Sequence, residues 1–171
     1  MNTTTLFSKI KEAGNELYQL LEPLTESQLN TVPFKDSWTP AQLATHVTKS
    51  NKGMEQALEM QGAASVRDIA ERVPELESLF LNFEIKMQSP PFIVPGPGPY
   101  EKQKVLAAFK TSCDAVFAQM QNAQLAEVID MPKTFGQISK LELCHFVLYH
   151  TQRHLHQLKK MLPYLQVAVP Q

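Results

Sequence analysis

Residues 143–161 read LCHFVLYHTQRHLHQLKKM and contain four of the five histidines of this 171-residue chain. Each residue of an α-helix advances about 100° around the axis, so His150 and His154 would lie within roughly 40° of each other. Gln157 falls on the same face, one turn further along. Two imidazoles spaced in this way on a helix can both reach one metal ion, whose bonds to nitrogen are about 2.0–2.1 Å long.

A third ligand has to come from another part of the chain, because two imidazoles alone hold a metal ion poorly. The only histidine outside the stretch is His46, which falls in the apolar stripe of a second predicted helix. We therefore predict a divalent metal, Zn, Ni, Fe or Mn, bound by His46, His150 and His154, with Gln157 orienting a ligand or contacting substrate. Three neutral imidazoles that leave a coordination position open are typical of a catalytic metal. The alternative is that the histidines are hydrogen-bonded core residues.

The same helical geometry sets His145 and His156 apart from the pair. They lie well over 100° from His150 on the helical wheel, so we predict that neither is a ligand and that both are solvated or at an interface. Tyr149 and Glu142 are the nearest titratable candidates for a general base, and neither shares the ligand face closely. The catalytic residues therefore stay unassigned.

Composition describes one ordinary globular domain spanning residues 1–171. Hydrophobic residues make up 43% of the chain and charged residues 19%, with a net charge of −1, so no electrostatic bias favours nucleic acid or an anionic membrane. The N-terminus lacks a signal-peptide pattern, and no apolar run approaches the ~20 residues needed to span a bilayer. Cys113 and Cys144 are predicted to be free thiols, and the expected location is the cytoplasm.

The helical spacing of apolar residues, together with capping residues and prolines at the helix ends, predicts an all-α chain. Thr39 and Gln42 form a capping-box pattern that starts the second helix, and Ser139 and Glu142 repeat it at the start of the last one. The predicted elements are four long helices and a shorter one, packed as a bundle, with a capped turn at residues 25–28. Their ranges are Leu6–Leu21, residues 40–60, Glu75–Met87, Tyr100–Asn122 and a last helix that ends before Pro163.

The segments between these helices are predicted to be irregular. Residues 90–99 contain five of the twelve prolines, which excludes helix or central strand and predicts an extended crossover. This crossover either borders the pocket of the metal or merely spans the end of the bundle. Residues 130–137 are predicted to be loop, and no stretch has a convincing strand pattern. Sequence motifs of other enzyme classes are missing: His-Glu-x-x-His, Gly-x-Ser-x-Gly and a phosphate-binding glycine loop.

Taken together, these residues resemble the DinB/YfiT-like superfamily of metalloenzymes. Trp-Thr-Pro-x-x-Leu-x-x-His, ending at His46, precedes His150-Thr-Gln-Arg-His154-x-x-Gln157 by about a hundred residues, and the likeness extends over nearly the whole chain. The resemblance implies a four-helix bundle in which the three histidines bind one divalent metal. The Thr-Gln-Arg sequence and the proline-rich crossover look most like an uncharacterised branch of the family.

The resemblance also implies an activity. Family members use the metal to activate a low-molecular-weight thiol for transfer or isomerisation, so thiol S-transfer is the preferred reaction and metal-dependent hydrolysis the runner-up. A helical stress or interaction protein with structural histidines is the non-enzymatic alternative. The expected partners are a small-molecule substrate and a second copy of the chain. The homodimer is also favoured by a wide apolar arc on the last helix: Leu141, Cys144, Leu148, Leu155 and Leu162.

Overall fold

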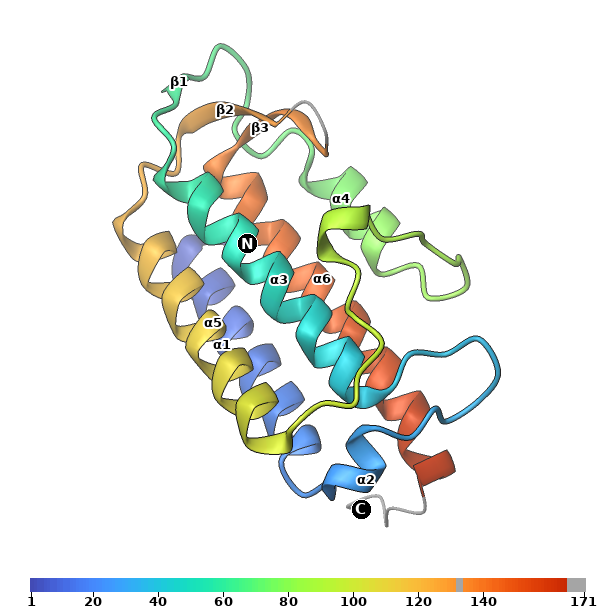
Figure 1. Ribbon diagram of the computed structural model, residues 1–171. Coiled ribbons are helices and arrows are strands. Elements are labelled where there is room, and N and C mark those ends of the chain that lie inside the picture. The colour runs from blue at the N-terminus through green and yellow to red at the C-terminus, as the bar shows by residue number, and fades with distance from the viewer. Residues whose placement is uncertain (132–133, 166–171) are drawn as a thin grey trace.

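The computed structural model describes residues 1–131 and 134–165 and confirms the all-α four-helix bundle. Four long helices lie side by side, and each packs against two of the others (Figure 1). Around the bundle, α1 contacts α5 and α6, and α3 also contacts α5 and α6. The four helices are α1 (Thr3–Leu21), α3 (Pro40–Glu59), α5 (Lys102–Asn122) and α6 (Lys140–Met161).

Capping boxes begin two of these helices at the predicted residues. The hydroxyl of Thr39 accepts a hydrogen bond from the amide of Gln42, whose side chain accepts one from the amide of Thr39. Ser139 and Glu142 make the same pair of bonds at the start of α6. These bonds satisfy amides that an uncapped helix end would leave unpaired, so they fix where each helix begins. The first helix starts earlier than predicted, at Thr3, because the side chain of Asn2 caps it.

The third predicted helix is shorter than its sequence pattern indicates. The pattern predicted Glu75–Met87, whereas α4 runs over Val73–Phe80. Beyond it, the guanidinium of Arg153 in α6 donates hydrogen bonds to the carbonyls of residues 80, 82 and 85. Those carbonyls are acceptors that a continuing helix would use for its own amides, so the chain leaves the helix there.

A small antiparallel sheet corrects the prediction that the chain has no strands and that residues 130–137 are loop. Its three strands follow the order β1, β2, β3, and β2 and β3 form a hairpin at one end of the bundle (Figure 1). Ile129 pairs with Ile138, and both side chains are buried. Strands this short show too few alternations for their period to stand out in the sequence. The strands are β1 (Ala63–Ala64), β2 (Glu127–Met131) and β3 (Gly136–Ser139).

The proline-rich segment crosses from α4 to α5, as predicted, and runs along α3 (Figure 1). It contains one short 3-10 turn, η1 (Pro91–Ile93), which contacts α3. The remaining short elements are α2 (Glu26–Leu29), which has the predicted capping box, and the turn η2 (Leu162–Leu165) that follows α6. The crossover therefore covers the bundle on the side where α3 and α6 meet.

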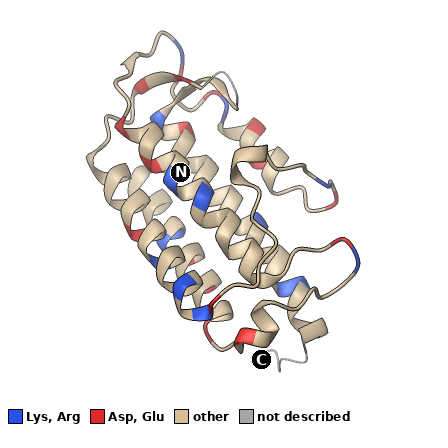
Figure 2. Ribbon diagram, in the orientation of Figure 1, with Lys and Arg blue, Asp and Glu red and all other residues tan. Residues whose placement is uncertain are grey.

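The apolar arc of the last helix is used inside the chain. Cys144, Leu148, Leu155 and Leu162 are all buried within the single chain, so this arc no longer argues for a homodimer, which stays a prediction. Charged residues of both signs are interspersed over the helices and loops (Figure 2). Within the described residues, none of the helices combines the length and the apolar character that a membrane crossing requires.

Candidate metal centre

Three histidines from two helices meet in the interior. His46 lies about two turns into α3, and His150 and His154 lie on consecutive turns of α6. Their side chains are 2%, 5% and 5% exposed, respectively. In the described part of the chain they form the group of side chains that could hold a metal ion, with one nitrogen of each ring within 4.8 Å of the others.

The nitrogens that face one another are all Nε2 atoms. The Nε2 of His150 lies 3.1 Å from that of His46 and 3.0 Å from that of His154. Ligand atoms around a tetrahedral ion with bonds of about 2.0–2.1 Å are about 3.3 Å apart. Two of the three separations are therefore close to the value that one shared ion requires, and the third is within 4.8 Å.

Hydrogen bonds on the far side of two rings decide which nitrogen carries the proton. The Nδ1 of His46 lies 3.1 Å from the carbonyl oxygen of Ile93, and the Nδ1 of His154 lies 2.7 Å from the Oε1 of Gln157. Both oxygens accept hydrogen bonds, so each Nδ1 donates and each Nε2 keeps a free lone pair.

The three histidines cannot satisfy all of their Nε2 lone pairs by hydrogen bonds among themselves. A neutral His150 can donate from Nε2 to His46 or to His154, but not to both, so at least one pair of lone pairs would face each other without a proton between them. A cation bound by all three nitrogens removes this conflict. The donor set therefore fits a divalent metal, and neutral imidazole is the form that such a metal binds.

Burial keeps the rings neutral. Removal from water is the largest cause that lowers the pKa of His46, of His150 and of His154, and the pKa of His154 falls to about 3. Positive charge acts in the same direction, from Lys49 on His46 and from Arg153 on the other two rings. At neutral pH all three imidazoles are therefore deprotonated and free to coordinate.

Aromatic side chains hold the rings from outside. The indole of Trp38 lies with its ring centroid 4.9 Å from that of His46, and Phe146 stacks on His150 at 5.0 Å. Trp38 directly precedes the cap of α3, so the start of the helix positions both this ring and His46. In the sequence, Trp38 is the first residue of the motif that ends at His46, but no pattern predicted that its side chain would lie at the site.

A pocket of about 930 Å³ reaches the cluster. The three histidines and Gln157 line it. Residues of the crossover, including Phe92 and Val94, also line it, so the crossover borders the pocket, which was one of its two expected placements. The rest of the lining mixes apolar and aromatic side chains with polar and charged ones, and it comes from α3, α4, α6 and the loops between helices. This volume lies in the range of small-molecule sites, so a bound ion would be accessible to a substrate.

Arg153 supports one wall of this pocket, a role that the sequence did not predict. It is 5% exposed, and its guanidinium donates to three backbone carbonyls, one at the last residue of α4 and two in the segment after it. Its place next to His154 in the helix gave no indication of this role, because the acceptors are backbone atoms about seventy residues away. The arginine therefore couples the helix that carries two ligands to the segment that closes the pocket.

The two remaining histidines do not belong to the cluster. His145 was predicted to be solvated or at an interface, and this is wrong: it is 4% exposed, and its Nδ1 lies 3.2 Å from the hydroxyl of Tyr149. His156 is half-buried and stacks on Phe83, with ring centroids 4.0 Å apart. The far face of α6 packs against other elements of the same chain, so a position opposite the ligands is not a position in solvent.

Neither candidate general base reaches the three rings. The carboxylate of Glu142 is fully buried and accepts hydrogen bonds from both terminal nitrogens of Arg67, each 2.7 Å long, and from backbone amides. The hydroxyl of Tyr149 faces His145 and Glu77, and burial raises its pKa to about 12. Glu142 is thus a structural residue that joins the start of α6 to the segment before α4.

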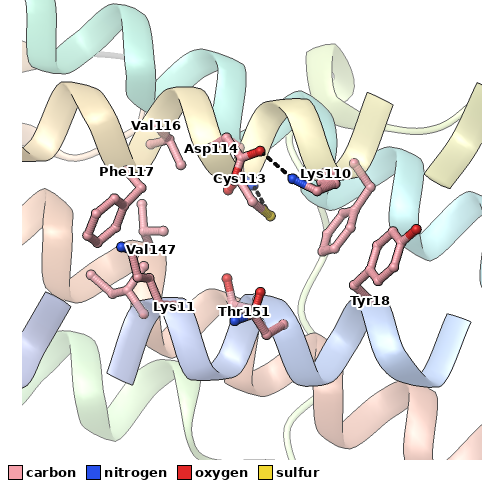
Figure 3. A pocket seen from close by; sticks show the side chains of 14 residues that line it. Lys11, Tyr18, Lys110, Cys113, Asp114, Val116, Phe117, Val147 and Thr151 are labelled. Carbon is pink, nitrogen blue, oxygen red and sulfur yellow. Dashed lines mark hydrogen bonds and ion pairs between the residues drawn. The ribbon is translucent and has the colours of Figure 1, made fainter. Parts of the chain in front are cut away.

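A second cavity, of about 210 Å³, lies between α1 and α5 (Figure 3). Tyr18 and Lys11 line it from α1, and Cys113 lines it from α5. Cys113 and Cys144 are free thiols, as predicted, and burial raises their pKa values to about 11 and about 12. Both thiols stay protonated near neutral pH, so neither is an activated nucleophile that would compete with the histidine cluster as the reactive centre.

Comparisons with known proteins agree with this architecture. Residues 9–158 match a family model described as the DinB superfamily. Among solved structures, the chain is similar to YfiT from Bacillus subtilis, described as a probable metal-dependent hydrolase with an unusual four-helix bundle topology. The TM-score is 0.62 at 16% sequence identity, over 95% of this chain and 89% of that one. No curated protein matches the sequence.

Proposed function

Because the chain belongs to the DinB superfamily, we propose that it is a metal-dependent enzyme whose His46, His150 and His154 bind one divalent ion. The observation that carries the proposal is the convergence of three buried Nε2 atoms. In two of these rings, His46 and His154, the other nitrogen, Nδ1, donates a hydrogen bond to an oxygen outside the cluster. A divalent ion held by three neutral imidazoles keeps an open position and lowers the pKa of a water or thiol bound there.

The chain's own residues prepare this site in three ways. The carbonyl of Ile93 and the side chain of Gln157 hold two rings in the tautomer that coordinates. Trp38 and Phe146 pack against the rings and limit their rotation. The apolar pocket admits a small-molecule substrate and excludes part of the solvent, which strengthens electrostatic interactions at its base.

Hydrolysis is the reaction that we place first. The description of YfiT as a probable metal-dependent hydrolase supports it, whereas none of the described residues marks a thiol substrate. Thiol S-transfer, which the family resemblance implied, becomes the alternative. The metal cluster of the described residues contains no carboxylate, so the three ligands themselves supply no proton acceptor in either reaction.

Metal content tests the proposal directly. Protein purified without a histidine tag should contain close to one equivalent of a transition metal by elemental analysis, and the identity of that metal would then be known. Protein that neither retains nor takes up Zn, Ni, Fe, Mn or Co would contradict the proposal and favour structural histidines. With the metal identified, panels of ester, amide and phosphate substrates, and of thiols with electrophiles, separate hydrolysis from S-transfer.

A further inference from the structure

Six large hydrophobic side chains in the lining of the metal pocket are exposed to solvent, interspersed with charged ones such as Glu84 and Lys86. Phe92 is 60% exposed, and other large hydrophobic side chains around the opening are also exposed by more than a third. They come from the loop before α3, from α4 and the segment after it, and from the crossover. Exposed apolar patches that surround a pocket mark binding surfaces. The exposed members are Phe34, Leu79, Phe83, Ile85, Phe92 and Val94.

The base of the pocket differs from the apolar rim because it would carry positive charge. The three ligands are neutral, so a bound divalent ion would retain its full charge. Two cationic side chains, Arg153 and Lys160, line the pocket from α6, the helix that carries His150 and His154, whereas the lining carboxylates of Asp36, Glu75 and Glu84 come from other segments. The base of the pocket therefore favours an anionic group, whereas its walls and rim favour an apolar one.

We propose that the pocket binds an amphiphile, with an anionic metal-ligating head at the histidine cluster and an apolar body along the rim formed by α4 and the crossover. This inference rests on the proposed function, because the head needs the metal. The occupant is a small molecule rather than a second protein, since the pocket volume of about 930 Å³ lies in the range of small-molecule sites and all three histidines line this pocket.

Chain-length dependence of binding tests this inference. The protein is first loaded with Co²⁺, whose visible absorption bands report the histidine site. Acetohydroxamate and octanohydroxamate, which carry the same head, are then titrated below the micellar concentration while the bands are followed. We expect octanohydroxamate to bind at least about a hundredfold more tightly, because each buried methylene contributes about threefold to fourfold in affinity.

A pair of rim variants identifies where the chain lies. Phe92→Ala should weaken octanohydroxamate binding about threefold to tenfold and leave acetohydroxamate binding unchanged, because the truncated side chain contacts only the apolar body. Val66→Ala is the matched control, since Val66 is fully exposed and does not line the pocket. Both replaced side chains are exposed, so neither variant removes a core contact.

The outcomes separate the two proposals. Failure of Co²⁺ to give bands that depend on His46 would overturn the proposed function. Normal bands with less than about a fivefold preference for the longer chain would overturn the amphiphile inference alone. So would light scattering that shows a dimer which Phe92→Ala dissociates, because a second copy of the chain would then cover the rim.

Discussion

The Nε2 of His46 lies 3.1 Å from the Nε2 of His150, although 104 residues separate them in the chain. His154 completes the set from the next turn of the same helix, with its Nε2 3.0 Å from that of His150. Such a convergence of buried neutral nitrogens is costly without a proton or a cation to share. In the bundle, at least one pair of facing Nε2 atoms therefore lacks a hydrogen bond, which a bound cation would replace.

The first prediction concerns removal of a ligand. His46→Ala, His150→Ala and His154→Ala should each lower the affinity for Zn²⁺ or Co²⁺ by about a hundredfold or more, equal to about 2.7 kcal/mol. Calorimetric or spectroscopic titration measures the effect. His156→Ala is the control, because this histidine lies outside the cluster, and it should bind metal like the unmodified protein.

The second prediction concerns stability with and without metal. An ion that binds only the folded chain stabilises it by about 2.7 kcal/mol at a hundred times its Kd. For a chain of this size, that corresponds to a rise in Tm of about 5–10 °C. Thermal unfolding with added Zn²⁺, and after chelation, measures the rise. Equal Tm values under both conditions would argue against a site formed only in the folded chain.

The third prediction assigns a role to Gln157. Its Oε1 accepts from the Nδ1 of His154 and so holds that ring in the coordinating tautomer. Gln157→Ala should therefore reduce metal affinity about tenfold to a hundredfold, as expected for a partner of a metal-bound histidine. Gln152→Ala, on the same helix, is the matched control. Equal affinities in the two variants would show that Gln157 does not orient the ligand.

The fourth prediction concerns acid stability at the start of α6. Burial raises the pKa of Glu142, but hydrogen bonds from Arg67, Ser139 and Arg72 outweigh it and hold the pKa below its ordinary value of 4.5. A carboxyl with a lowered pKa in the folded chain stabilises it above that ordinary value, and the contribution is lost as the pH falls through the lower folded value.

Replacement of Glu142 tests this dependence. Glu142→Gln should destabilise the protein by about 3 kcal/mol at pH 7, because Arg67 then loses its charged partner. It should also lose less stability than the unmodified protein between neutral pH and the acid range, as urea unfolding would show. Glu127→Gln is the comparison, since the Glu127–Lys140 pair is more exposed on its carboxylate side. An equally steep acid loss in Glu142→Gln would contradict the assignment.

The fifth prediction concerns the pocket wall. Arg153→Met keeps the buried stem and removes the donors to three carbonyls, so it should cost about 1–3 kcal/mol. Amide hydrogen exchange should accelerate in residues 81–87, whereas α3 keeps its protection. Lys160→Met, in the same helix and pocket lining, should leave exchange unchanged. Unaltered exchange in Arg153→Met would mean that other contacts hold the wall.

Local sequence determined where two of the long helices begin and which two of the three candidate ligands share a helix face. The Thr39–Gln42 and Ser139–Glu142 boxes are hydrogen-bonding patterns that span three residues, so the start of each helix is encoded where it occurs. Likewise, His150 and His154 share a face of α6 because the helix repeats every 3.6 residues. His46 was then predicted as the third ligand because it is the only histidine outside residues 143–161.

Tertiary structure decided which residues far apart in the sequence contact these helices and histidines. The carbonyl of Ile93 at His46, and the bonds of Arg153 that end α4 early, join backbone atoms to side chains that no local periodicity relates. The burial of His145 and the pairing of Ile129 with Ile138 likewise depend on which segments the bundle brings together. Helical hydrogen bonds span four residues and are readable in sequence, whereas these contacts form only when packing places distant segments side by side.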